Sequence, residues 1–187
     1  MNDYAEILAK DDCLLLLVDL QKTLLEPCFE KEPVTRNAAA LIDLAGVFKI
    51  PILASVHNPE KLGGFLPELL ERIPQPSFYN KLEFSCFENE KIFRALQETG
   101  CRTVLLAGLE THVCIFQTGA HALRLGYRVH VVADAVTSRR KVDREVGLGR
   151  LERAGAVISS TEMVIFELLN RAGTPEFRAV LPLLKSL

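Results

Sequence analysis

An aspartate, a lysine and a cysteine stand just beyond strand-like apolar segments and together could perform nucleophilic chemistry. They are Asp19, Lys81 and Cys114. A thiol nucleophile needs a base to take its proton and a cation to steady the charge that results. Asp19 can supply the base and Lys81 the cation. The three residues therefore form a complete set for a cysteine nucleophile, provided that the fold brings them together.

Each of these residues also has an ordinary structural explanation. Asp19 can be a turn residue or a helix N-cap, Cys114 a small buried apolar side chain, and Lys81 a solvated surface charge. Cys114 lies where a helix is expected to begin. The unpaired N–H groups and the dipole of a first helical turn favour thiolate over thiol.

Histidine is the commonest partner of a catalytic cysteine, but the sequence disfavours such a pair. His112 and His121 stand at offsets of −2 and +7 from Cys114 on the expected helix. The first offset points away from the sulfur, and the second lies about two turns along the helix. His57 stays open as an alternative base.

Strand-like and helix-like segments alternate along the chain. The run of leucines before Val18 is apolar without alternation, which is typical of a strand covered on both faces. Strands are expected at 13–19, 51–56, 77–80, 103–108, 129–133 and 157–159, and helices at 33–48, 88–99, 112–125, 141–154, 163–170 and 175–184.

Three of the expected helices end in a glycine that is followed by an apolar run, at Gly100, Gly126 and Gly155. Glycine suits the left-handed position that closes a helix. The repeated order of helix, glycine and strand predicts an α/β fold with a parallel sheet between helical layers. We expect one domain over residues 1–187. Its ligand site should lie beyond the carboxyl ends of the strands, where the strand order reverses.

Composition limits the class of partner. The chain has 187 residues, 49% of them hydrophobic, and a formal charge of −2. This charge gives no general attraction to nucleic acid or to acidic membranes, and no apolar run is long enough to span a bilayer. We therefore expect a small-molecule substrate, with no nucleic-acid or membrane partner.

The cysteines and the N-terminus indicate the compartment. The five cysteines form an odd set without any C-x-x-C pair, which favours reduced thiols over a disulfide framework. Residues 1–6 show no basic stretch followed by an apolar one, so we expect no secretory signal. Together these features predict a cytoplasmic protein.

Three motifs, taken in order and spacing, resemble those of the isochorismatase-like hydrolases. They are Leu-Val-Asp-Leu-Gln around Asp19, Lys-Leu-Glu-Phe-Ser from Lys81, and Gly-Leu-Glu-Thr-His-Val-Cys ending at Cys114. The later stretch Val132–Arg139 is similar to the isochorismatase-domain-containing subgroup. The resemblance implies a three-layer, Rossmann-like fold with a six-stranded parallel sheet of order 3-2-1-4-5-6. It also implies a homo-oligomer.

The same resemblance implies an Asp19–Lys81–Cys114 triad that hydrolyses non-peptide, amide-type C–N bonds through a thioester. A cis peptide bond is implied between Leu109 and Glu110, with the N–H groups of Glu110 and Cys114 forming an oxyanion hole. We expect the substrate pocket to include Gln21, His57, Phe84 and Thr111.

Two departures from family patterns narrow the chemistry. Members that bind a metal carry an aspartate two residues before a histidine, and here Ser55 precedes His57 instead. One imidazole makes a poor zinc site, so we expect no metal and no cofactor. True isochorismatases cleave a vinyl ether and lack the nucleophilic cysteine, so Cys114 argues against that reaction.

Two other functions remain open. Cys114 could be oxidised and reduced rather than acylated, with Cys86 as the resolving thiol. Alternatively, the chain could be a binding or scaffold protein without turnover. The basic run Arg139-Arg140-Lys141 is interpreted as solvated surface, with an oligomer contact or a substrate-anion role as the alternative.

Overall fold

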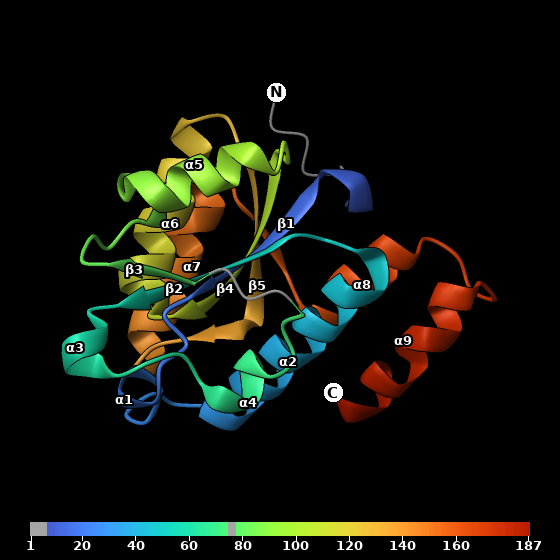
Figure 1. Ribbon diagram of the computed structural model, residues 1–187, viewed down its shortest axis with the longest axis horizontal. Coiled ribbons are helices and arrows are strands. Elements are labelled where there is room, and N and C mark those ends of the chain that lie inside the picture. Colours follow the sequence, from blue (N-terminus) through green and yellow to red (C-terminus); the bar gives the residue numbers. More distant parts are fainter. Residues whose placement is uncertain (1–6, 75–77) are drawn as a thin grey trace.

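The computed structural model describes residues 7–74 and 78–187, which form a six-stranded parallel sheet between layers of helices (Figure 1). The strands lie in the order β3-β2-β1-β4-β5-β6, which confirms the expected fold class. Residues 1–6 and Ser77, where the third strand was expected to begin, lie outside the described residues. The strands are β1 (Cys13–Val18), β2 (Ile52–His57), β3 (Phe78–Lys81), β4 (Thr103–Leu109), β5 (Arg128–Thr137) and β6 (Val157–Ser159).

Helices pack on both faces of this sheet (Figure 1). One face carries α2 (Lys31–Phe48), α4 (Pro67–Leu70), α8 (Thr161–Leu169) and α9 (Pro175–Ser186), and the other carries α5 (Glu90–Glu98), α6 (Phe116–Arg124) and α7 (Lys141–Arg153). Two further short helices are α1 (Lys22–Leu25) and α3 (Pro59–Leu62). Within the described residues, no helix is both long and apolar enough to cross a membrane.

β1 runs through the centre of the sheet and every one of its residues is buried. Leu15 and Leu17 pack into the core beneath α2 and α8, whereas Leu14 and Leu16 pack into the core beneath α5 and α6. Successive side chains of a strand point to opposite faces, so both faces of this strand must be apolar. The run of leucines without alternation was thus correctly interpreted as a strand covered on both sides.

β5 is longer than expected and extends past Ala133 to Thr137. Its register against β4 shifts between Leu106 and Gly108, and the pairing then resumes at Val136 and Thr137. A bulge of this kind bends a strand locally, and bulges are common next to active sites. Here the bulge lies one strand away from Asp19.

A buried histidine in β5 makes folding sensitive to acid. His130 is 4% exposed, and burial, followed by the charge of Arg128, lowers its pKa from 6.5 to about 4. Protonation therefore favours the unfolded chain. The stability that His130 contributes is present above pH 6.5 and is lost as the pH falls through 4. The loss should reach about 3 kcal/mol of unfolding free energy.

Urea unfolding of wild type and His130→Asn between pH 7.5 and 4 measures this contribution. Other groups titrate in both proteins, so the difference between the two curves isolates residue 130. The wild type should lose more stability than the variant as the pH falls below 6.5. Parallel curves would show that His130 protonates equally well in the folded and unfolded states.

Candidate active site

The site forms at the carboxyl ends of β1 and β4, the central neighbours at which the strand order reverses. Gly108 in β4 permits this close pairing, because a Cβ there would lie 2.0 Å from the carbonyl oxygen of Val18. Asp19 follows Val18 with a φ of 53°, and its N–H donates to the carbonyl of Ser55 in β2. A left-handed aspartate is uncommon, and such residues cluster at functional sites.

Asp19 is held at both of its carboxylate oxygens. Lys81 Nζ donates to Oδ2 at 2.6 Å, and Ser55 Oγ donates to Oδ1 at 2.7 Å. The side chains of Asp19 and Lys81 are fully buried, and Lys81 also donates to the carbonyl of Glu83 at 3.2 Å. β1, β2 and β3 therefore bring one acid and one amine, far apart in sequence, into a single buried ion pair.

Two opposing influences act on Lys81. Burial works to lower its pKa, but the Asp19 carboxylate works to raise it, and the net pKa is raised. The amine therefore stays a cation beside the carboxylate, as its expected role requires.

Cys114 lies on a turn of unusual geometry. Residues 112–125 were expected to form one α-helix, but residues Thr111–Ile115 form a π-helical turn and α6 begins only at Phe116. π-turns widen a helix by one residue and are frequent at functional sites. The turn packs directly on α7, where a Cβ at Gly147 would lie 2.9 Å from the carbonyl oxygen of Thr111.

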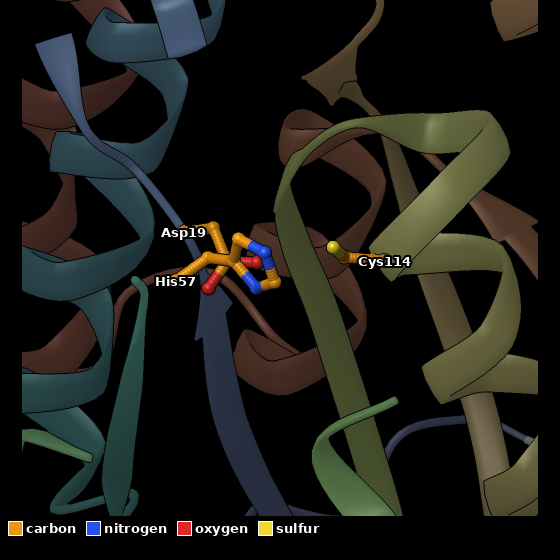
Figure 2. A group of neighbouring side chains, drawn as sticks. All are labelled: Asp19, His57 and Cys114. Atoms are coloured by element: carbon orange, nitrogen blue, oxygen red, sulfur yellow. The ribbon is translucent and has the colours of Figure 1, made fainter. Parts of the chain in front are cut away.

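The sulfur of Cys114 faces the Asp19 carboxylate and the His57 ring (Figure 2). Sγ, one Asp19 oxygen and one ring nitrogen of His57 all lie within 4.8 Å of one another. Cys114 itself is only 6% exposed. The structure thus places Asp19, which is bonded to Lys81, close to the sulfur.

The protonation state of Cys114 differs from the expectation. Burial, and next the Asp19 carboxylate, raise the pKa of the thiol, and the opposing effect of Lys81 is smaller. The helix start was expected to favour thiolate, but desolvation dominates. At neutral pH the site therefore holds a thiol beside a carboxylate. A base must take the proton when sulfur attacks.

The contact between Ser55 and Asp19 was not predicted from the sequence, in which Ser55 only takes the place of an aspartate. Its hydroxyl is fully buried and bonds Asp19 Oδ1, and Cys86 Sγ lies 3.6 Å from the same hydroxyl. Cys86 is also fully buried, and burial raises its pKa to about 11. Ser55 therefore fixes the carboxylate oxygen that Lys81 does not hold.

A Ser55→Ala variant should lose about 1–3 kcal/mol of unfolding free energy, because one buried carboxylate oxygen loses its hydrogen-bond donor. Urea unfolding at pH 7.5 gives the value. Ser159→Ala is the matched control, since Ser159 is also buried but bonds the neutral His130 at a longer 3.4 Å. Equal losses in the two variants would show that the bond to Asp19 has no special weight.

His57 at the end of β2 is positioned by two neighbours. Gln21 Oε1 accepts from His57 N at 2.7 Å, and Gln21 Nε2 donates to the carbonyls of His57 and Gly63. Phe84, 48% exposed, stacks on the ring with centroids 5.6 Å apart. The side-chain amide of Gln21, which was expected in the substrate pocket, is thus hydrogen-bonded to backbone groups. Phe84 thus packs on the ring of His57, one nitrogen of which lies within 4.8 Å of the Cys114 sulfur.

Two polar atoms at the site are buried without a hydrogen-bond partner: His57 Nδ1 and Thr111 Oγ1. Burial and the charge of Lys81 lower the pKa of His57, so its ring is neutral at pH 7. Buried polar atoms are normally bonded, and exceptions often mark a ligand or a catalytic role.

The expected cis bond between Leu109 and Glu110 is wrong, since the described residues contain no cis peptide bond. Gly108, just before this bond, lies within β4 with a φ of 122°. Glu110 caps the π-turn in an extended conformation, and its Oε2 accepts from Arg139 N and Nε at 3.1 Å each.

The basic run beside this pair is occupied by local ion pairs. Arg139 pairs with Glu110, Arg140 with Asp143 at 2.7 Å, and Lys141 with Glu145 at 3.8 Å. All three basic side chains are more than half exposed. Surface ion pairs of this kind contribute little to stability, and the run is interpreted as solvated surface.

A cavity of about 540 Å³ opens beside Lys81 at the carboxyl ends of β2 and β3. A volume of this size is typical of small-molecule sites. The cavity is lined by Asn58, Pro59, Glu60, Lys61, Asn80, Lys81, Leu82, Glu83 and Asn89.

Comparison with known proteins identifies the family. The model of the isochorismatase domain matches residues 13–163. The chain belongs to the isochorismatase family. Members of this family are hydrolases, and the strand order and layers agree with that membership. The chain is 36% identical to isochorismatase domain-containing protein 2 of Bos taurus over 177 residues, covering 92% of this chain and 82% of that protein.

Solved structures of family-like proteins share the fold. The MAR1 ribonuclease of Caenorhabditis elegans superimposes with a TM-score of 0.91 at 29% identity, covering 96% of this chain and 93% of the other. The YcaC gene product of Escherichia coli, described as an octameric hydrolase of unknown specificity, gives 0.90 at 27% identity, covering 96% and 90%. The expected resemblance to isochorismatase-like hydrolases is therefore confirmed.

Proposed function

We propose that the chain is a cysteine hydrolase that cleaves a non-peptide, amide-type C–N bond of a small molecule through a thioester on Cys114. The observation that carries the proposal is the position of the buried Asp19 carboxylate. One of its oxygens accepts a hydrogen bond from Lys81 Nζ at 2.6 Å, and one of its oxygens lies within 4.8 Å of the Cys114 sulfur. A thiol that attacks a carbonyl carbon needs a base to take its proton and a cation to stabilise the charge, and here the carboxylate and the amine can supply them.

In the first half-reaction Asp19 takes the thiol proton as Sγ attacks the substrate carbonyl. The raised pKa of Cys114 means that this transfer accompanies attack rather than preceding it. The N–H groups of Cys114 and Glu110 stabilise the oxyanion. When the tetrahedral intermediate collapses, the C–N bond breaks, the amine leaves with the proton from Asp19, and the acyl group stays on sulfur.

In the second half-reaction Asp19 removes a proton from water, which attacks the thioester carbonyl. The C–S bond breaks, the carboxylic acid leaves, and the sulfur regains its proton. Lys81 stays a cation throughout, orients the carboxylate and offsets the negative charge that develops nearby. Ser55 holds the other carboxylate oxygen, so that the same oxygen faces Cys114 in both steps.

The setting favours a small, uncharged or anionic carbonyl compound that binds without metal or cofactor. His57 and Phe84 form one wall, and the fully buried Thr111 hydroxyl offers a polar contact to the substrate. Because the nucleophile is a cysteine, cleavage of a vinyl ether as in true isochorismatases is not proposed. The ribonuclease among the structural neighbours does not change the choice. The formal charge of −2 and the ion-paired basic run offer no surface for a polyanion.

We propose a homo-oligomer in a reducing, cytoplasmic compartment. All five cysteines are free. The octameric YcaC gene product supports assembly, and so do apolar side chains on the outer surface of α7, where Val142 and Val146 are each 54% exposed.

A library of small amides and esters tests the proposal through protection of Cys114. Substrates should release amine or alcohol and should slow the alkylation of Cys114 by iodoacetamide, with no change at Cys101. A Cys114–Cys86 disulfide on peroxide treatment, without any hydrolysis, would favour the redox function instead. No hydrolysis, combined with equal alkylation of Cys114 and Cys101, would favour a scaffold.

A further inference from the structure

Asp19, His57 and Cys114 form a group whose ligand atoms lie within 4.8 Å of one another. The three side chains come from the ends of β1 and β2 and from the π-helical turn, and they point toward one another (Figure 2). We propose that this group binds a thiophilic divalent cation, best met by Zn²⁺, and that the bound cation inhibits the enzyme by occupying the Cys114 sulfur.

The donor set fits zinc in type. Zinc takes cysteine sulfur at about 2.3 Å, histidine nitrogen at about 2.0 Å and carboxylate oxygen at about 2.0 Å, usually as a tetrahedron. Neighbouring ligands of such a tetrahedron lie about 3.3–3.8 Å apart. The group spans 4.8 Å, so its side chains must close by about 1 Å. Mg²⁺ and Ca²⁺ demand oxygen ligands, so the sulfur and nitrogen exclude them.

A second observation points to a ligand at the same place. His57 Nδ1 is buried and has no hydrogen-bond partner. The backbone of His57 is fixed by Gln21, and its ring stacks on Phe84 and is hydrogen-bonded to the backbone of Glu83. The ring is therefore positioned by its neighbours while Nδ1 stays available to a cation.

This group is not evident from the residues near His57 in the chain. Ser55 stands where a metal-binding relative has aspartate, and no second histidine follows it closely. The fold supplies the missing ligands from the catalytic residues instead. A cation held in this way would compete with catalysis, which separates it from a resident cofactor.

The charges balance without any redox step. Zn²⁺ displaces the proton of the Cys114 thiol, which passes to the buffer, and an S–Zn bond forms. The carboxylate, the thiolate and a neutral imidazole then surround the dication. Lys81 remains bound to Asp19 at 2.6 Å, and its positive charge opposes the cation. We therefore expect weaker binding than at a structural zinc site, and release by a chelator.

Inhibition follows from the bond itself. The electron pair that would attack a carbonyl is shared with the metal, and Asp19, the proposed base, is a ligand. Binding of the cation can be measured without a substrate, so this part of the inference can be tested separately from the proposed function.

Titration of the reduced, chelator-treated full chain with Co²⁺ tests the site. Cobalt reports its ligands by colour, because a thiolate–cobalt bond gives a near-ultraviolet charge-transfer band. Wild type should show this band at one equivalent, and Zn²⁺ should remove it by displacement. Cys114→Ala should abolish it.

His57→Phe keeps a ring to stack on Phe84 but removes both nitrogens. It should weaken cobalt binding at least tenfold, roughly, since even loss of an indirect support of a ligand weakens metal sites by 10–100-fold. Cys86→Ala is the matched thiol control and should leave the band unchanged. The proposal is overturned if no band appears, if His57→Phe binds as tightly as wild type, or if Cys86→Ala removes the band.

Iodoacetamide and a hydrolysed ester test the inhibitory half. Zn²⁺ should slow both the alkylation of Cys114 and the hydrolysis of the ester, and a chelator should restore both rates. Mg²⁺ should slow neither reaction. Zinc that accelerates hydrolysis would contradict inhibition and would make the cation a cofactor.

Discussion

A Cys114→Ala variant should hydrolyse amides and esters on the order of 10³-fold more slowly than wild type, or worse. The proposed base Asp19 is held beside this sulfur by Lys81 and Ser55, whereas the buried thiol of Cys86 donates to the Ser55 hydroxyl. Removal of one buried sulfur should lower the unfolding free energy by no more than about 1.5 kcal/mol, as for other small core truncations.

Steady-state hydrolysis of an ester found in the library gives the ratio, and urea unfolding shows that the variant is folded. Cys86→Ala is the control, because it removes another buried thiol and should retain most of the activity. If Cys114→Ala keeps its activity while Cys86→Ala loses it, the nucleophile has been assigned to the wrong cysteine.

A Lys81→Met variant should lose about 3–5 kcal/mol of unfolding free energy, because it leaves the buried Asp19 carboxylate without its cation. Both side chains of this pair are 0% exposed, so water does not screen the loss. The double variant Asp19→Asn/Lys81→Met removes the unpaired charge as well, and should be more stable than Lys81→Met alone.

Urea unfolding at pH 7.5 of the single and double variants measures this coupling. Lys31→Met is the matched control, since Lys31 pairs with Glu26 at 3.1 Å but the side chains are 33% and 66% exposed. It should change stability by about 1 kcal/mol or less. A Lys81→Met variant as stable as that control would show that the amine is not buried against the acid.

The fold was predictable because its physical causes are local. The segment Leu14–Val18 is apolar on both faces, which is expected of a strand that is covered on both faces, and the structure buries every one of these residues. Gly100, Gly126 and Gly155 end their helices with φ values of 72°, 82° and 106°, in the left-handed region where glycine avoids the strain of a Cβ. Strand order 3-2-1-4-5-6, in contrast, came from family resemblance and was then confirmed.

The sequence predicted which polar residues gather at this edge of the sheet, but not their protonation states or all of their contacts. Types and spacing pointed to Asp19, Lys81 and Cys114, and sheet order brings them to one edge. Burial of these polar side chains decides the rest, and the sequence did not indicate it for them. It raises the pKa of the Cys114 thiol against the expected effect of a helix start, and it makes the hydroxyl of Ser55 a partner of Asp19.

Errors and omissions occurred where backbone geometry or distant neighbours decide. The Leu109–Glu110 bond was expected to be cis and is trans. The turn at Thr111–Ile115 is π-helical, which periodicity alone does not reveal. The amide of Gln21, a residue expected in the pocket, is hydrogen-bonded to the backbone of His57 and Gly63, contacts that no sequence pattern indicates.

The most direct test is the mass of the protein during turnover. Wild type mixed with an ester substrate, quenched in acid and digested should carry the acyl group on the peptide that contains Cys114, and Asp19→Asn should carry little or none. An acyl group on another residue, or hydrolysis that proceeds with no acylated protein while Cys114 shows only added oxygen, would contradict a thioester on this sulfur.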